Sequence, residues 1–247
     1  MFMSQATSEA TETTSLLEVE DEDIQFPPCD LDSDEPPLDT DLHRNQIDLL
    51  IRLLQAWWQD RQDFYISGNL TVYYNEQQLK SRDFRGPDVF VVLGTEKKNR
   101  RSWAIWQEGG KYPNLVIELL SSSTAKVDKG AKKTLYQEVW RVPEYYWFHP
   151  DTLEFAGFRL VGGGYEVIAP TDSGNLPSEQ LGLELGIHEQ QLRWFTAQGD
   201  LIPLPEEVER QRAEQERQRA EQAQQRLEQL ENFLRSQGIE PDQLPDL

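Results

Sequence analysis

Apolar residues along the chain follow two periods, and each period predicts a different kind of element. From residue 42 to about residue 61 they recur every three or four positions, which is typical of an amphipathic helix. Shorter, denser apolar runs at residues 64–66, 70–74, 89–93 and 115–120 predict strands. The last run reads LVIELL, so it places an acid, Glu118, inside a strand that we expect to be central and buried.

The second half of the chain continues the alternation of strands and helices. Four hydroxyl residues at 121–124 provide N-cap groups and predict a helix over residues 124–140. An aromatic strand at 145–148, a hairpin formed by 153–160 and 165–169, and a short element at 181–187 follow. This order predicts an α/β fold in which a mixed central sheet is flanked by the two helices.

Both ends of the chain differ from the middle. Residues 1–41 contain thirteen Asp or Glu and no Lys or Arg, which predicts a disordered acidic tail before a domain at 42–198. Residues 199–247 predict a charged helix that contains the repeat ERQRAEQ at 209–215 and 216–222. A coiled-coil dimer and a solvated single helix both fit this segment. The seam of the dimer would be Ala213, Glu216, Ala220, Ala223, Leu227, Leu230 and Leu234.

Charge and composition limit the binding partners and the cellular compartment that fit the sequence. The formal net charge is −20, and residues 1–41 carry −13 of it, which leaves −7 for the rest of the chain. A local basic groove therefore remains compatible with the sequence. One cysteine, Cys29, rules out an internal disulfide and fits a reducing cytosol. Without a signal-like segment or an apolar run of membrane-spanning length, we expect a cytoplasmic protein that does not enter a membrane.

Several polar residues are placed where they could perform chemistry together. A buried carboxylate such as that of Glu118 is costly unless it has a partner. Asp88 precedes the strand at 89–93, so two acids would flank adjacent strands and could share a divalent cation. Asp128, Lys132 and Tyr136 are spaced by four residues and share one helical face. A lysine beside a metal can orient water and stabilise negative charge, which suits phosphodiester hydrolysis.

These motifs together resemble the PD-(D/E)xK nuclease superfamily, and most closely its Uma family of putative restriction endonucleases. The resemblance covers about residues 42–195 and also includes the block Val142-Pro143-Glu144-Tyr145 and Pro150. It implies a restriction endonuclease-like fold, with Asp88 and Glu118 as metal ligands.

The sequence departs from the superfamily pattern at the catalytic lysine. That residue usually lies two positions after the second acid, where this chain has Leu120, so the resemblance points to Lys132. His43 lies where the family often has a histidine on its first helix, and His149 replaces the usual aspartate before Pro150.

We therefore expect a homodimeric endonuclease that cuts DNA with Mg²⁺, or with Mn²⁺ as a substitute. Asp88, Glu118 and Lys132 would be catalytic, and the basic loop at 97–101 would attract the phosphate backbone. The remaining substrate-binding candidates are Lys129, Lys133, Tyr136 and His43. Two alternatives stay open: a non-catalytic DNA-binding or assembly module that dimerises through the C-terminal helix, and a metal-free hydrolase that uses Asp88 and Glu118 as an acid–base pair on a sugar or another ester.

Overall fold

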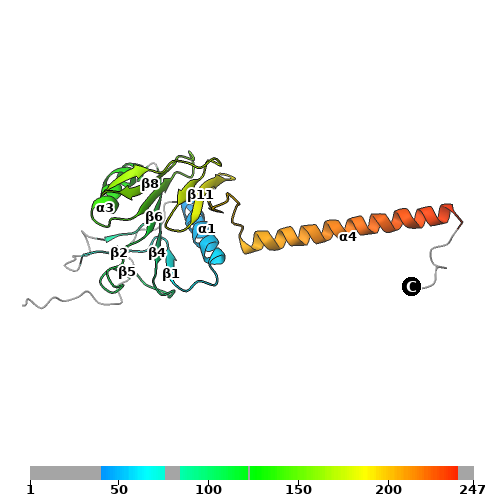
Figure 1. Cartoon of the computed structure of the whole chain (residues 1–247), viewed down its shortest axis with the longest axis horizontal. Helices are drawn as coiled ribbons and strands as arrows, with labels where there is room; N and C mark the ends of the chain where they lie inside the picture. The colour runs from blue at the N-terminus through cyan, green and yellow to red at the C-terminus, as the bar shows by residue number, and fades with distance from the viewer. Residues whose placement is uncertain (1–39, 76–83, 122, 239–247) are drawn as a thin grey trace, which may run out of the picture.

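The computed structural model describes residues 40–75, 84–121 and 123–238, so nearly all of the predicted acidic tail lies outside the described residues. A mixed sheet forms the centre of the domain, and a long helix projects from one side of it (Figure 1). The strands of this sheet, in spatial order, are β1 (Phe64–Ser67), β4 (Val89–Leu93), β6 (Leu115–Leu119), β7 (Glu144–Phe148), β8 (Phe155–Val161) and β9 (Gly164–Val167).

The central sheet is mixed because a single neighbouring pair in it, β6 and β7, is parallel and the other pairs are antiparallel. A parallel pair needs a long crossover connection, and the helical segment after β6 supplies it. This observation confirms the predicted α/β architecture. The strands predicted at 89–93 and 145–148 form almost as predicted, and the hairpin of β8 and β9 turns at Gly162 and Gly163.

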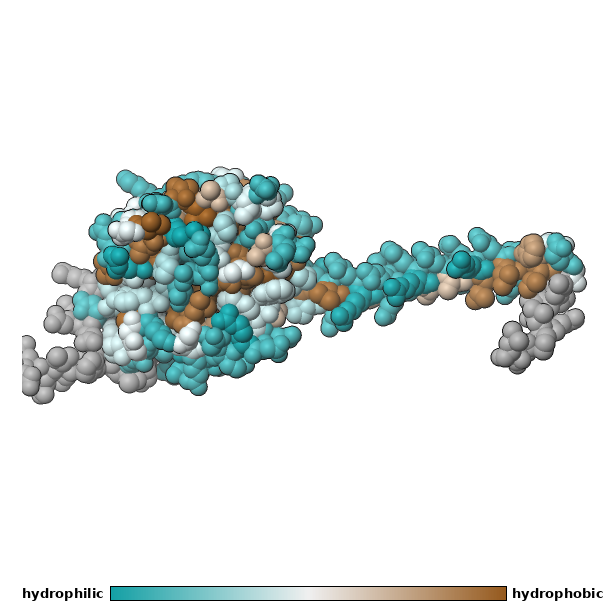
Figure 2. All heavy atoms as spheres, viewed as in Figure 1, coloured by the Kyte–Doolittle hydropathy of each residue, from teal (hydrophilic) through white to brown (hydrophobic). Residues whose placement is uncertain are grey.

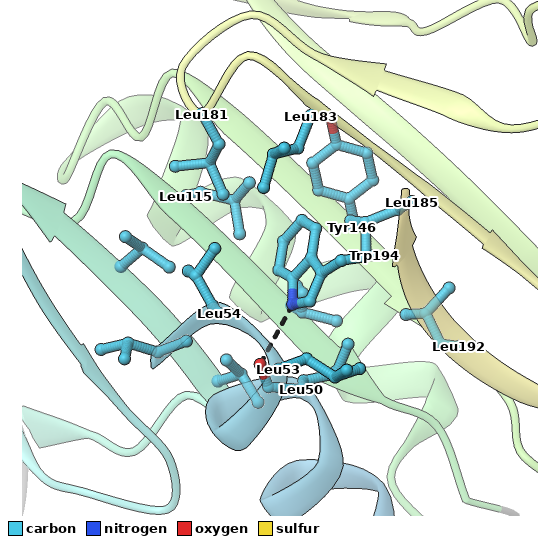
Figure 3. Packing of buried hydrophobic residues seen from close by; sticks show 14 of the residues in the cluster. Leu50, Leu53, Leu54, Leu115, Tyr146, Leu181, Leu183, Leu185, Leu192 and Trp194 are labelled. Atoms are coloured by element: carbon cyan, nitrogen blue, oxygen red, sulfur yellow. Dashed lines mark hydrogen bonds between the residues drawn. The ribbon is translucent and has the colours of Figure 1, made fainter. Parts of the chain in front are cut away.

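Each face of the sheet packs against its own helix, because side chains alternate between the faces along a strand. Helix α1 (Asp41–Trp57) covers the face that carries Ile117 and Tyr146. A second, three-stranded sheet of β10 (Leu176–Ser178), β11 (Leu183–His188) and β12 (Gln191–Thr196) also packs on this side. In this core the Trp194 indole Nε1 donates to the Leu50 carbonyl at 3.0 Å (Figure 3).

The helix predicted over residues 124–140 covers the opposite face, but it is not one regular helix. It consists of α2 (Ala125–Val127), a π-helical turn η1 (Asp128–Lys132) and α3 (Lys133–Glu138). Wide turns of this kind inside helices often occur at functional sites. Here the turn contains Asp128 and Lys132, two of the residues that the sequence placed on one helical face.

Two small sheets were not predicted from the sequence. One is the β10–β11–β12 sheet, of which the sequence indicated only a short element at 181–187. The other joins β2 (Val72–Tyr73), β3 (Phe84–Arg85) and β5 (Trp103–Ala104), and the strand predicted at 70–74 shrinks to the two residues of β2.

The charged C-terminal segment forms helix α4 (Pro205–Ser236). Glu207 fixes its first turn to the domain, because its Oε2 accepts hydrogen bonds from the Leu204 backbone N–H at 2.8 Å and from Arg193 Nη2 at 2.9 Å. Among the helices described here, α4 included, none combines the length and the apolar character needed to cross a bilayer.

Candidate active site

The register of the central sheet places Asp88 and Glu118 opposite each other. Val89 pairs with Ile117 in the antiparallel ladder of β4 and β6, so the next pair along these strands is Asp88 and Glu118. The Asp88 Oδ2 accepts a hydrogen bond of 2.7 Å from the Leu119 backbone N–H, and the Asp88 backbone N–H lies 3.4 Å from Glu118 Oε2. Backbone pairing therefore fixes both acids on the sheet face that α3 covers.

Two side chains from the covering helix converge on the Glu118 carboxylate. The Tyr136 hydroxyl donates to Oε1 at 2.6 Å, and Lys132 Nζ donates to Oε2 at 3.0 Å. Glu118 is 0% exposed and Lys132 is largely buried. The structure confirms that Lys132 and Tyr136 lie on one face of this helical segment. That face packs against Glu118, the strand acid that needed a partner.

Asp128 is a further member of the cluster that the sequence placed on the same face but not among the candidate site residues. Its Oδ1 lies 2.9 Å from Lys132 Nζ, and its side chain is 1% exposed. Neither of its carboxylate oxygens makes a well-aligned hydrogen bond within the described part of the chain. Its backbone carbonyl accepts from the Tyr145 hydroxyl at 2.9 Å, which holds the π-helical turn against the sheet. The sequence signal for Asp128 was its position four residues before the lysine.

Burial and crowding of negative charge shift the pKa values of the cluster. Loss of hydration raises the pKa of Glu118 to about 7, against the opposing effect of Lys132. Burial also raises the pKa of Asp88 and of Asp128. For the lysine, burial alone would lower the pKa, but the carboxylates of Glu118, Asp128 and Asp88 outweigh it and raise the pKa above its ordinary value. The lysine is therefore held as a cation.

His43 links the start of α1 to the edge of the cluster. Its Nε2 lies 3.2 Å from the Leu119 carbonyl oxygen, and its Nδ1 lies 3.0 Å from Thr40 Oγ1. A carbonyl can only accept, so Nε2 donates to it in this arrangement. The substrate-binding role expected for His43 stays a prediction; the structure shows its contact with the carbonyl of Leu119, the residue after Glu118.

The other basic candidates are engaged with protein groups. Lys129 Nζ lies 2.6 Å and 2.7 Å from the two carboxylate oxygens of Glu154, and Lys133 Nζ lies 3.4 Å from the ring centroid of Phe158. In the 97–101 loop, the largely covered side chain of Arg100 forms a bidentate pair with Glu108. A phosphate would have to compete with these contacts. The roles of Lys129 and Lys133 as substrate ligands stay predictions.

The carboxylates of Asp88 and Glu118 can be compared with the ligand set that Mg²⁺ uses in proteins. No group of three or more His, Cys, Asp or Glu side chains in the described ranges is arranged as a metal cage. Mg²⁺ is usually bound through one or two carboxylates and keeps several waters. Asp88 and Glu118 supply two such carboxylates, and three acids around a single lysine leave negative charge that a dication would offset.

The chain belongs to the Uma2 family, described as "Putative restriction endonuclease", whose family model matches residues 30–201. A crystal structure of a putative nuclease belonging to DUF820, from Anabaena variabilis ATCC 29413, is similar at 14% identity and a TM-score of 0.43, covering 59% of this chain and 76% of that one. No curated protein matches the chain.

Proposed function

We propose that this protein is a Mg²⁺-dependent endonuclease that hydrolyses phosphodiester bonds in DNA, with Mn²⁺ as a substitute metal. The observation that carries the proposal is the pairing of the fully buried Glu118 with Lys132 at 3.0 Å and with Tyr136 at 2.6 Å, directly across the ladder from Asp88. Membership in a family described as "Putative restriction endonuclease" supports the choice of a nucleic acid substrate.

In this proposal Asp88 and Glu118 hold the metal. Bound Mg²⁺ would supply Lewis-acid stabilisation of charge on the phosphate and would favour ionisation of water. Tyr136 holds Oε1 of the glutamate, which leaves Oε2 directed towards Lys132 and the Asp88 backbone N–H. The tyrosine is thus a positioning residue for the carboxylate.

Lys132 acts as a cation in this mechanism. Its raised pKa keeps the ammonium protonated, so it donates hydrogen bonds and stabilises negative charge instead of accepting a proton from water. A fixed ammonium that does not need to reorganise is worth most in a site from which water is largely excluded.

The direct test is incubation of supercoiled plasmid with the full chain in Mg²⁺, Mn²⁺ or EDTA. We expect nicking or linearisation with either metal and none in EDTA. Glu118→Gln should abolish cleavage and metal binding by calorimetry, because it removes the charge and keeps the shape. Glu184→Gln is the matched control, since Glu184 is a buried acid of the second sheet that accepts from Asn175 at 3.0 Å.

The outcomes separate the proposal from its alternatives. Cleavage that persists in EDTA would favour a metal-free acid–base hydrolase that uses Asp88 and Glu118. Metal binding without cleavage of any nucleic acid would favour a non-catalytic DNA-binding or assembly module. Equal metal affinity in the wild type and Glu118→Gln would contradict the assigned metal ligands.

A further inference from the structure

The far end of α4 carries an apolar surface with no covering element among the described residues. Leu227, Leu230 and Phe233 are 60%, 54% and 60% exposed, although the rest of the helix is dominated by charged and amide side chains. Figure 2 shows this apolar surface gathered at the end of α4 farthest from the domain. Large apolar side chains grouped on an otherwise polar helix mark an interaction site.

The spacing of these residues is that of a two-stranded coiled coil. Leu227, Leu230 and Leu234 are separated by three and four positions, and Ala220 and Ala223 extend the same seam towards the domain. The seam weakens further back, because Glu216 occupies the next core position. The part of α4 that can pair is therefore about residues 220–237.

We propose that this segment pairs in parallel with the same segment of a second copy of the chain. In a parallel pair, a residue flanking the seam on one helix faces the residue five positions later on the other. Arg226 then faces Glu231 of the second copy, and the two-fold axis creates this pair twice. Closer to the domain than this segment, Arg212 would face Arg217 of the second copy, and this repulsion disfavours pairing there.

The charges also disfavour the antiparallel arrangement. If Leu227 lay opposite Leu230 of an antiparallel partner, residues at equivalent flanking positions would meet. Arg226 would then face Phe233, and Glu231 would face Gln224. Neither contact is an ion pair, so only the parallel arrangement makes use of both charges.

The attachment of α4 sets where the two domains lie. Glu207 binds Arg193, and Glu206 binds Arg52 on α1, so the first turn of α4 is fixed to its domain. At 1.5 Å per residue, pairing from residue 220 begins roughly 22 Å along the helix. A parallel pair with two-fold symmetry therefore holds both domains at one end, separated by two unpaired stretches of helix. This arrangement does not depend on the proposed nuclease activity.

Sedimentation of the full-length protein over a range of concentrations tests the dimer. We expect a reversible dimer for the wild type and a monomer at every concentration for Leu227→Glu with Leu230→Glu. The matched control is Gln225→Glu with Gln229→Glu, which adds the same charge outside the seam and should behave as wild type. A wild type that stays monomeric throughout the range, or a dimer that survives in the seam variant, overturns the proposal.

Orientation is tested separately. In a Cys29→Ser background, Leu234→Cys should be joined to itself by a short bismaleimide only when the helices are parallel, because in the antiparallel register residue 234 lies opposite residue 223, roughly 16 Å along the axis from its own copy. Arg226→Glu should weaken the dimer by roughly fivefold to tenfold at low salt, and adding Glu231→Arg should restore it. Absence of both the cross-link and the restoration overturns the parallel arrangement.

Discussion

At the scale of single residues, the free-energy cost of burying the Glu118 carboxylate explains which groups surround it. An ionised carboxylate without solvent needs compensation, and the structure provides it through the Tyr136 hydroxyl and the Lys132 ammonium. The acid inside an apolar run made this residue recognisable from the sequence alone. The contact between Lys132 and the second carboxylate, that of Asp128, could not be predicted in the same way. The spacing of the two residues indicated a shared helical face, but their contact depends on the π-helical turn.

Asp128 is expected to act through the lysine. If it positions the ammonium between itself and Glu118, Asp128→Asn should lower kcat roughly tenfold to a hundredfold with little change in KM, because the lysine would act mainly in the transition state. The double variant Asp128→Asn, Lys132→Ala should be no slower than Lys132→Ala alone. Single-turnover cleavage measures these rates.

Two control variants accompany this comparison of the single and double variants. Asp172→Asn changes an exposed acid and Lys126→Ala changes an exposed lysine of the same helical segment, and both should retain most of the activity. Additive losses in the double variant would contradict a positioning role for Asp128.

The raised pKa of Glu118 predicts how stability depends on pH. A group that binds a proton more tightly in the folded state stabilises the fold while protonated. Its folded pKa of about 7 exceeds the ordinary value of 4.5, so this contribution is complete below about pH 4.5 and is lost as pH rises through about 7. The loss is at most about 3 kcal/mol. Urea unfolding without metal should show this decline.

The same titration offers a check on the metal proposal. In Glu118→Gln the decline in the free energy of unfolding between pH 4.5 and 7 should be smaller, because the titrating group is gone. Added Mg²⁺ should offset the decline in the wild type, since a bound dication stabilises the ionised acid. A decline of equal size in both proteins would show that other groups cause it.

At the scale of elements, dense apolar strands and the amphipathic helix were predictable from the sequence, and short or irregular elements were not. The run VFVVL became β4 with the predicted bounds because both faces of that strand are buried. Strand β10 contains Pro177, and β2 is two residues long, so neither produces a period that can be recognised. Their pairing depends on tertiary contacts, as does the π-helical turn that presents Asp128 and Lys132.

Glu144 makes one such set of tertiary contacts, and it joins the central sheet to the sheet of β10, β11 and β12. Its Oε1 accepts from the Glu179 backbone N–H at 2.7 Å and from the Gln180 backbone N–H at 3.2 Å, and its Oε2 accepts from the Ser178 hydroxyl. Glu144→Gln replaces one of the two accepting oxygens by an amide NH₂ donor and removes the negative charge. We expect a loss of about 2–3 kcal/mol in the free energy of unfolding.

The matched control for this prediction is Glu166→Gln, which alters an exposed acid on β9. Urea denaturation of both variants gives the comparison, and the control should stay within about 0.5 kcal/mol of the wild type. A Glu144 variant as stable as the control would mean that the two sheets are held together mainly by their apolar contacts.

At the scale of the whole molecule, charge is distributed in a way that bears on a polyanionic substrate. Twelve of the Asp and Glu residues lie in residues 1–39, and this segment has no Lys or Arg. It joins the described domain at Thr40, whose hydroxyl contacts the same His43 that reaches the Leu119 carbonyl. The acidic segment is therefore tethered beside the cluster that would bind the phosphate.

A tethered anion competes with DNA at high effective concentration, and salt weakens both contacts. Removal of residues 1–39, which keeps Thr40, should tighten DNA binding on the order of tenfold near 50 mM salt, with the difference shrinking as salt rises. A variant whose twelve acids become Asn or Gln keeps the length of the segment and isolates its charge. Fluorescence anisotropy with a labelled duplex in Ca²⁺ would measure all three proteins. If the neutral segment leaves affinity as weak as the native one, the competition is not electrostatic, and the charge of residues 1–39 does not limit DNA binding.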